Sequence, residues 1–197
     1  MATGRRITRD DIMDMESYAK LRAEERARIN ALKQDRRLEV GPFATFYFEN
    51  FDTMRHQIHE MLFVERGGEA QLADELNAYN PLVPQGRELV ATLMFEIEDA
   101  ARRDRELRRL GFVERTVTLA IDGEEVKAVA EGDVERTKPD GARTSSVHFL
   151  HFPLTDAQAA RFKTPGAKVV LAINHENYGH AATMPERVRA ALAGDLA

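Results

Sequence analysis

The sequence predicts an α+β fold in which a mostly antiparallel sheet of about six strands carries helices on one face. Two observations lead to this class. First, two strand-like segments, 44–49 and 91–96, have similar sequences. Each is followed by a helical pattern and then by the tetrapeptide Phe-Val-Glu-Arg. Second, Asp122-Gly123 joins two strand-like segments, which is the strongest short signal for a β-hairpin. The chain therefore contains two similar strand–helix units and at least one hairpin.

The composition is that of an ordinary globular chain, and it excludes several kinds of site. The 197 residues are 43% hydrophobic and 31% charged, which predicts a single domain over 1–197. There is no cysteine, so disulfides, thiol catalysis and Fe–S ligation are excluded. The net charge is −5 without a basic stripe, and no apolar run approaches the ~20 residues that span a bilayer. We expect a cytoplasmic protein that binds neither nucleic acid nor membrane.

Residues 1–37 are expected to form an N-terminal helical segment packed on the rest of the domain. A capping box at Thr8 and Asp11 opens this segment. Its apolar stripe is thin, which is typical of a helix that packs either on the core of its own chain or on a second copy of the chain. Packing on a second copy would give a homodimer.

The remaining elements follow from periodicity and turn signals. Asp52 and Asp99 are expected to cap the helices that follow the two strand copies. A short helix at about 69–78 and a loop with two prolines at 79–84 separate the two units. The later part of the chain is expected to form strands at 116–121, 124–130, 146–152 and 168–174, a helix at 156–162, and a last helix behind a capping box at Thr183 and Glu186.

One face of the repeated strands gathers polar side chains. Alternate residues of a strand share a face, so Tyr47 lies with Glu49 on the first copy, and Glu96 lies with Glu98 on the second. If both faces point the same way, the carboxylates cluster, and Glu49 and Glu96 become candidate ligands of a hard metal ion or an acid–base pair. The alternative is the solvent-exposed polar face of an antiparallel sheet.

The loop 79–84 precedes the second strand copy and is the best candidate for a site on a loop. Its prolines restrict the backbone, while Tyr79 and Asn80 offer an aromatic ring, a hydroxyl and an amide. We therefore predict the ligand-binding residues Tyr47, Glu49, Tyr79, Asn80 and Glu96. The alternative is that Tyr79 only packs and that Asn80 forms a local turn.

The histidines do not form a recognisable motif. His56 and Glu60 stand four residues apart but opposite the apolar stripe centred on Ile58, so a solvent-exposed position is expected. His148 and His151 are three apart in a strand and should point to opposite faces. No nucleotide-binding or nucleophile-elbow motif is present, and the sequence indicates no particular cofactor.

The chain resembles a bacterial family known as domain of unknown function 3501, over nearly its whole length. The matching segments are Thr8–Asp11, Arg36-Arg37 with Val40–Pro42, Phe48–Asn50, Gln57 with Glu60-Met61, Glu75-Leu76, Tyr79–Leu82 with Pro84, and Ala91-Thr92 with Glu96. The pair His56 and His59 lies outside the family pattern. The resemblance implies a link to peroxide defence or redox metabolism, because the family's genes often lie beside rubrerythrin and an Fe–S oxidoreductase.

Two functions follow as alternatives. The first is a binding or accessory protein of a cytoplasmic redox system, with a redox protein as its partner and no redox chemistry of its own. The second is a metal-dependent, hydrolase-like enzyme with a carboxylate-lined site, in which Glu49 and Glu96 hold a metal that activates water. The sequence does not identify the substrate or ligand.

Overall fold

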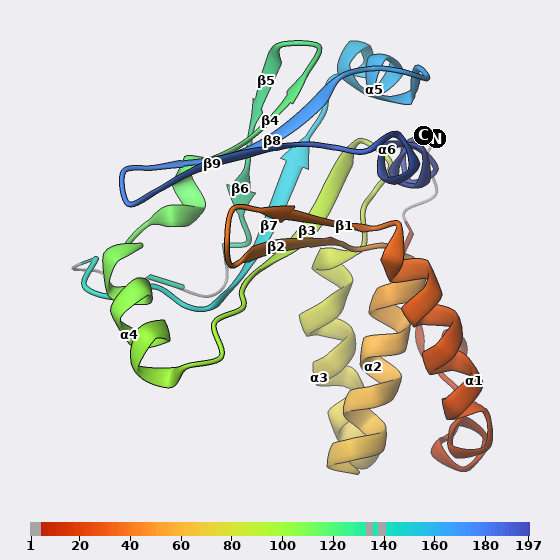
Figure 1. The fold of residues 1–197 in the computed structure, drawn as a ribbon. Coiled ribbons are helices and arrows are strands. Elements are labelled where there is room, and N and C mark those ends of the chain that lie inside the picture. Colours follow the sequence, from red (N-terminus) through yellow and green to blue (C-terminus); the bar gives the residue numbers. More distant parts are fainter. Residues whose placement is uncertain (1–4, 133–135, 138–140) are drawn as a thin grey trace.

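The fold consists of two antiparallel sheets with helices around them (Figure 1). The computed structural model describes residues 5–132, 136–137 and 141–197. The first sheet has the order β1 (Arg37–Val40), β2 (Ala44–Phe48), β3 (Glu88–Phe95), β7 (Val147–Pro153), β6 (Val129–Ala130). The second has the order β5 (Glu124–Lys127), β4 (Val117–Ile121), β8 (Val169–His175), β9 (Tyr178–Thr183).

The helices fall into two groups. Three of them project from one face of the first sheet in Figure 1: α1 (Met15–Gln34), α2 (Phe51–Glu65) and α3 (Gly68–Tyr79). The others are α4 (Ala100–Arg109), α5 (Asp156–Lys163) and α6 (Glu186–Ala193), with short 3-10 turns at Arg9–Asp11, Asn80–Leu82 and Val113–Thr116. Within the described part of the chain, no helix is both long and apolar enough to cross a bilayer.

The alternation of side chains in β2 and β3 creates two cores. Phe46, Leu93 and their neighbours of the same parity point away from the helices and pack against the second sheet in the larger core. Residues of the opposite parity, such as Val90, face the helices and join the smaller core around Ile58 and Leu72. The second sheet therefore covers one face of the first sheet, and the helices cover part of the other; Val90 there is buried, whereas Glu96 of the same parity is exposed.

Tyr178 connects the two sheets at the turn between β1 and β2. Its hydroxyl donates to the carbonyl of Val40 and accepts from the backbone N–H groups of Phe43 and Ala44. Gly41 in this turn has φ +76, and a Cβ there would lie 2.7 Å from the Tyr178 hydroxyl. A side chain at this position would disturb both the backbone and the contact between the sheets.

The α+β class and the antiparallel pairing are confirmed, but the strands form two sheets where one was expected. The Asp122-Gly123 hairpin is present, with both residues at positive φ. Two capping predictions were wrong. Asn50, not Asp52, accepts the capping hydrogen bond of α2, from the N–H of Thr53. Thr183 lies in β9, and α6 begins behind Pro185 without a side-chain cap.

The thin apolar stripe of α1 packs against other residues of the same chain. Tyr18 and Ile29 are each 1% exposed, and α1 packs along α2. Leu21 is the large apolar residue that α1 leaves exposed, at 44%. The homodimer predicted from this stripe stays a prediction.

Candidate functional site

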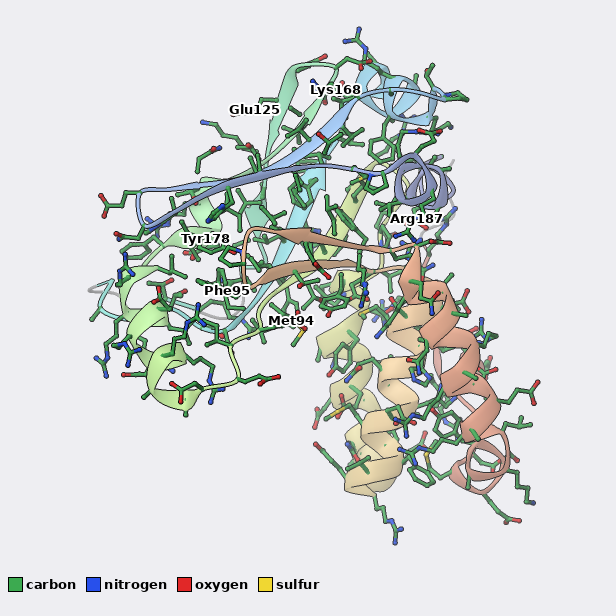
Figure 2. All side chains as sticks on the ribbon, viewed as in Figure 1. Met94, Phe95, Glu125, Lys168, Tyr178 and Arg187 are labelled. Atoms are coloured by element: carbon green, nitrogen blue, oxygen red, sulfur yellow. The ribbon has the colours of Figure 1, made fainter. Side chains whose placement is uncertain are left out.

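An open cavity of about 350 Å³ lies where the ends of three helices meet the first sheet. Both strands and helices contribute to its wall. Its polar lining residues are Lys33 of α1, Tyr47 of β2, Glu49, Gln57 of α2, Tyr79 of α3 and Thr92 of β3; its apolar ones are Met54, Leu82, Met94 and Phe149. Met94 lies on the helix side of the sheet in Figure 2. We call this space the helix–sheet cavity.

Glu49 is the most deeply buried charged residue of the cavity wall, with 5% of its surface exposed. The hydroxyl of Thr53 donates to one carboxylate oxygen at 2.6 Å, and the hydroxyl of Thr92 donates to the other at 2.7 Å. Among the described residues, no cation pairs with this carboxylate. Burial of a carboxylate without a counter-ion is costly, so this arrangement calls for an explanation.

Arg36 reaches the backbone of Glu49, but its charge is paired with another carboxylate. Arg36 is buried and donates to the backbone carbonyls of Phe48 and Glu49, but its ion pair is with Asp195 near the C-terminus. Glu49 lies directly before the N-cap of α2, and the positive end of that helix favours its negative charge. The dipeptide Glu49-Asn50 therefore places a carboxylate directly after β2 and directly before the first turn of α2.

Tyr47 and Glu96 are in contact, but only Tyr47 lines the helix–sheet cavity. The Tyr47 hydroxyl donates to Glu96 at 2.8 Å, and the hydroxyl of Thr45 donates to the second carboxylate oxygen at 2.7 Å. Burial, together with the hydrogen bond to Glu96, raises the pKa of Tyr47 to about 12. Glu96 itself is exposed and lines a separate hollow of about 400 Å³, which also contains Phe43 and Arg102.

Tyr79 and Asn80 are neighbours in sequence with different surroundings. Tyr79 lines the cavity, and burial raises the pKa of its hydroxyl. Asn80 instead uses its amide to hold the N-terminal segment, accepting from the N–H of Ile7 at 2.8 Å and donating to its carbonyl at 2.9 Å. It also donates to the carbonyl of Leu76. Asn80 is not among the residues that line the helix–sheet cavity.

The two predicted metal ligands share a face of the sheet but stand at opposite ends of it. Glu49 follows Phe48, which pairs with Ala91, whereas Glu96 follows Phe95, which pairs with Ala44. At about 3.4 Å per residue the two positions are roughly 20 Å apart along the strands. In 5–132, 136–137 and 141–197, no group of three or more His, Asp or Glu side chains could hold a metal ion. The geometry gives the metal-dependent hydrolase no support.

The solvent-exposed face predicted for His56 and Glu60 was wrong. Glu60 accepts two hydrogen bonds from Arg22 of α1 and one from Tyr18, and the Tyr18 hydroxyl lies 3.4 Å from His56. A helical wheel assumes one buried side, whereas α2 lies between α1 and α3 (Figure 1) and is covered on both flanks. The prediction for His148 and His151 holds, since His148 lies in the core and His151 on the opposite face, between Glu88 and Glu131.

Several residues of the cavity wall were not predicted. Lys33, Gln57 and Phe149 come from three different elements, and no spacing in the sequence connects them. Strand parity could have identified Phe149 and Thr92, because both belong to the helix-facing side of the sheet. Lys33 carries no such signal.

A larger hollow, of about 520 Å³, lies at the outer ends of the helices and is a weaker candidate site. It is mainly apolar, with Ile12, Leu62 and Leu72 in its wall. Arg9 and Glu69, two of its charged residues, are paired with each other at 2.8 Å. It holds no deeply buried polar side chain, so the helix–sheet cavity is the better candidate.

Comparisons with known proteins support the fold and the family. A crystal structure described as a novel protein of unknown function from Burkholderia pseudomallei is 42% identical to this chain. The similarity covers 98% of this chain and 100% of that one, with a TM-score of 0.90. No curated protein matches the chain. The family described as "Protein of unknown function (DUF3501)" matches residues 6–196. The chain belongs to this family.

Proposed function

We propose that the protein is a binding protein for a small organic molecule, which it holds in the helix–sheet cavity with Glu49 as the polar anchor. The observation that carries this proposal is a carboxylate with 5% exposure that lines a cavity and has only hydroxyl partners among the described residues. The volume of about 350 Å³ lies within the range of ligand pockets. Apolar walls with a few converging polar groups are typical of such pockets.

A purely structural role explains this carboxylate poorly. Thr53 and Thr92 would each be satisfied by a neutral acceptor, and replacing a buried charge by a neutral or apolar group is often neutral or stabilising. Groups that cost stability are typical of functional sites. Glu49 fits this pattern, whereas Asn80 and Glu96 fit structural roles.

The methionines provide a direct test of where a ligand binds. Met54 and Met94 line the helix–sheet cavity, whereas Met13 and Met15 line the outer hollow. In methyl-labelled protein screened against a library of small organic molecules, we expect ligands to shift the Met54 and Met94 resonances and to leave Met13 and Met15 unchanged. Glu49→Gln should weaken these ligands and leave the unfolding free energy at or above the wild-type value, because it removes a buried charge. A library in which no compound perturbs Met54 or Met94 would contradict the proposal.

The setting of this binding role is proposed to be a cytoplasmic redox system with a redox protein as partner. Support comes from the family resemblance together with the absence of cysteine, which removes thiol chemistry from the chain itself. Affinity capture from a native bacterial lysate, under conditions that preserve weak complexes, should recover a flavin, haem or Fe–S protein. Recovery of none would count against this setting and would leave the cavity proposal untouched.

A further inference from the structure

The helix–sheet cavity has two opposite charges in its wall that do not neutralise each other. Glu49 approaches from the sheet, and Lys33 approaches from the end of α1. In the described part of the chain, neither side chain forms an ion pair, with each other or with a third group. Arg22 and Glu60, by contrast, pair directly between α1 and α2 at 2.8 Å. The two charges of the cavity are left free to meet a ligand.

The helices explain how both charges are tolerated without a partner. Lys33 lies in the last turn of α1, whose C-terminal end carries partial negative charge. Glu49 precedes the N-terminal end of α2, which carries partial positive charge. Each charge therefore stands at the helix end that stabilises it. The positions of the two helix ends on the sheet set the positions of the two charges.

Most of the remaining cavity wall is apolar or aromatic. Met54 and Met94 contribute flexible thioether side chains, which adapt to the shape of a ligand. Tyr79 and Phe149 contribute rings, and a ring face attracts an organic ammonium group as well as an apolar chain. The cavity thus combines an anionic point, a cationic point and an adaptable apolar wall.

We infer that the ligand is a small zwitterion of the amino-acid type, with its ammonium group at Glu49, its acidic group at Lys33 and a short apolar body against Met54, Met94 and Phe149. This inference rests on the proposed binding function of the same cavity. The ammonium group of the ligand would form an ion pair with the Glu49 carboxylate, which has no cationic partner among the described residues. A ligand with only one of the two charges would leave one charged group of the wall without a partner.

Two probe series of matched shape test this inference. The first consists of leucine, isoamylamine, isocaproate and isoamyl alcohol; the second consists of ε-aminohexanoate, hexylamine, hexanoate and hexanol. Each series contains a zwitterion, a cation, an anion and a neutral molecule. Affinity is measured by titration of the Met54 and Met94 methyl resonances, with Met13 and Met15 as internal controls. We expect one of the two zwitterions to bind at least roughly tenfold more tightly than each singly charged analogue of its series. The identity of the tighter zwitterion then indicates how far apart the charges of Glu49 and Lys33 lie.

Two variants give opposite expectations. Glu49→Gln should weaken the amine of the preferred series and leave the carboxylate analogue unchanged or tighter. Lys33→Met should do the reverse. Lys20→Met is the matched control, because Lys20 is exposed on the same helix and paired only with Glu16; it should change no affinity.

The outcomes separate this inference from the function on which it rests. Binding of the neutral alcohols at Met54 and Met94 with an affinity equal to that of the zwitterions overturns the inference and retains the small-molecule function. The same holds if Glu49→Gln weakens all four members of a series equally. If no probe perturbs these resonances while an unrelated compound does, the ligand class is wrong. If no compound of any class binds, both proposals fail.

Discussion

Glu49 and Glu60 show how the partners of a carboxylate separate a structural residue from a candidate site residue. Glu60 lies between α1 and α2, where the Arg22 guanidinium forms two hydrogen bonds with it and Tyr18 adds a third. Glu49 is more deeply buried, and within the described part of the chain it receives only hydroxyl groups. Glu60 therefore holds two helices together, whereas Glu49 is the carboxylate that we propose as the ligand anchor.

The stability of the α1–α2 contact should depend on pH through Glu60. Hydrogen bonds from Arg22, with that from Tyr18, lower its pKa from 4.5 to about 2. Because the folded-state pKa is depressed, this contribution is present above pH 4.5 and is lost as the pH falls towards 2. We expect Glu60→Gln to lower the unfolding free energy by roughly 2 kcal/mol at pH 7 and by much less near pH 2.

Urea titrations of wild type and variant across this range measure the difference. Glu24→Gln is the control, since Glu24 is exposed on α1, and it should stay within about 0.5 kcal/mol of wild type at each pH. A Glu60→Gln deficit that is equal at pH 7 and near pH 2 would show that the charge pair with Arg22 is not its cause.

At the scale of elements, one histidine links the short edge strand β6 to the rest of the first sheet. β6 pairs with β7 at two positions, one of which is Val129 opposite His151. The His151 ring nitrogens lie 2.9 Å from Glu88, at the start of β3, and 2.8 Å from Glu131, just after β6. Three neighbouring segments of the sheet thus meet at a single imidazole.

This arrangement predicts that β6 loosens as the pH rises. The hydrogen bond to Glu88, supported by that to Glu131, raises the pKa of His151 above 6.5. A raised folded-state pKa means that the stabilisation is complete below pH 6.5 and is lost as the pH rises through the folded value. Amide exchange at Glu131, whose N–H binds the carbonyl of Phe149, should accelerate over that range beyond the intrinsic base-catalysed rate.

His151→Gln should remove this additional pH dependence, because glutamine does not titrate. His180→Gln, a change at an exposed histidine of β9, should leave it in place. Exchange at Glu131 that follows the intrinsic rate in wild type would contradict the role of His151.

The elements also show which features of this protein the sequence predicts. Strand parity correctly grouped Tyr47 with Glu49, because alternation is a property of the single strand. It did not fix the distance between Glu49 and Glu96, which depends on the antiparallel register of β2 with β3. The second sheet and the partial burial of His56 and Glu60 were missed for the same reason. Each depends on which elements become neighbours, and a local pattern does not carry that information.

At the scale of the whole molecule, the C-terminal segment closes the fold onto the first sheet and the N-terminal segment. Asp195 pairs with Arg36 in the interior, and its backbone carbonyl accepts from Arg5. The N–H of Ala197 donates to the carbonyl of Gly86, just before β3. Arg36 in turn binds the carbonyls of Phe48 and Glu49, so the C-terminal segment is connected directly to the backbone of the candidate site.

Removal of one partner of the Arg36–Asp195 pair should therefore be among the most destabilising single substitutions. Arg36 is 3% exposed and Asp195 is 7% exposed, so removal of Arg36 leaves a buried carboxylate without its direct ion-pair partner. We expect Arg36→Met to lower the unfolding free energy by about 3–5 kcal/mol at pH 7. The double variant Arg36→Met/Asp195→Leu should recover part of this loss, because it removes the second charge but leaves the carbonyls of Phe48 and Glu49 without their donor.

The pH dependence of the single variant identifies the unpaired charge as the cause. Burial raises the pKa of Asp195 even beside Arg36, and loss of that cation should raise it further. Because protonation removes the buried charge, the deficit of Arg36→Met relative to wild type should shrink as the pH falls from 7 towards 4, and the double variant should show no such change. Guanidinium chloride titrations at several pH values measure both, with Arg37→Met at the exposed neighbouring position as the control. If Arg36→Met costs less than about 1 kcal/mol, or its deficit is independent of pH, the closure of the fold depends on the packing of α6 and not on this ion pair.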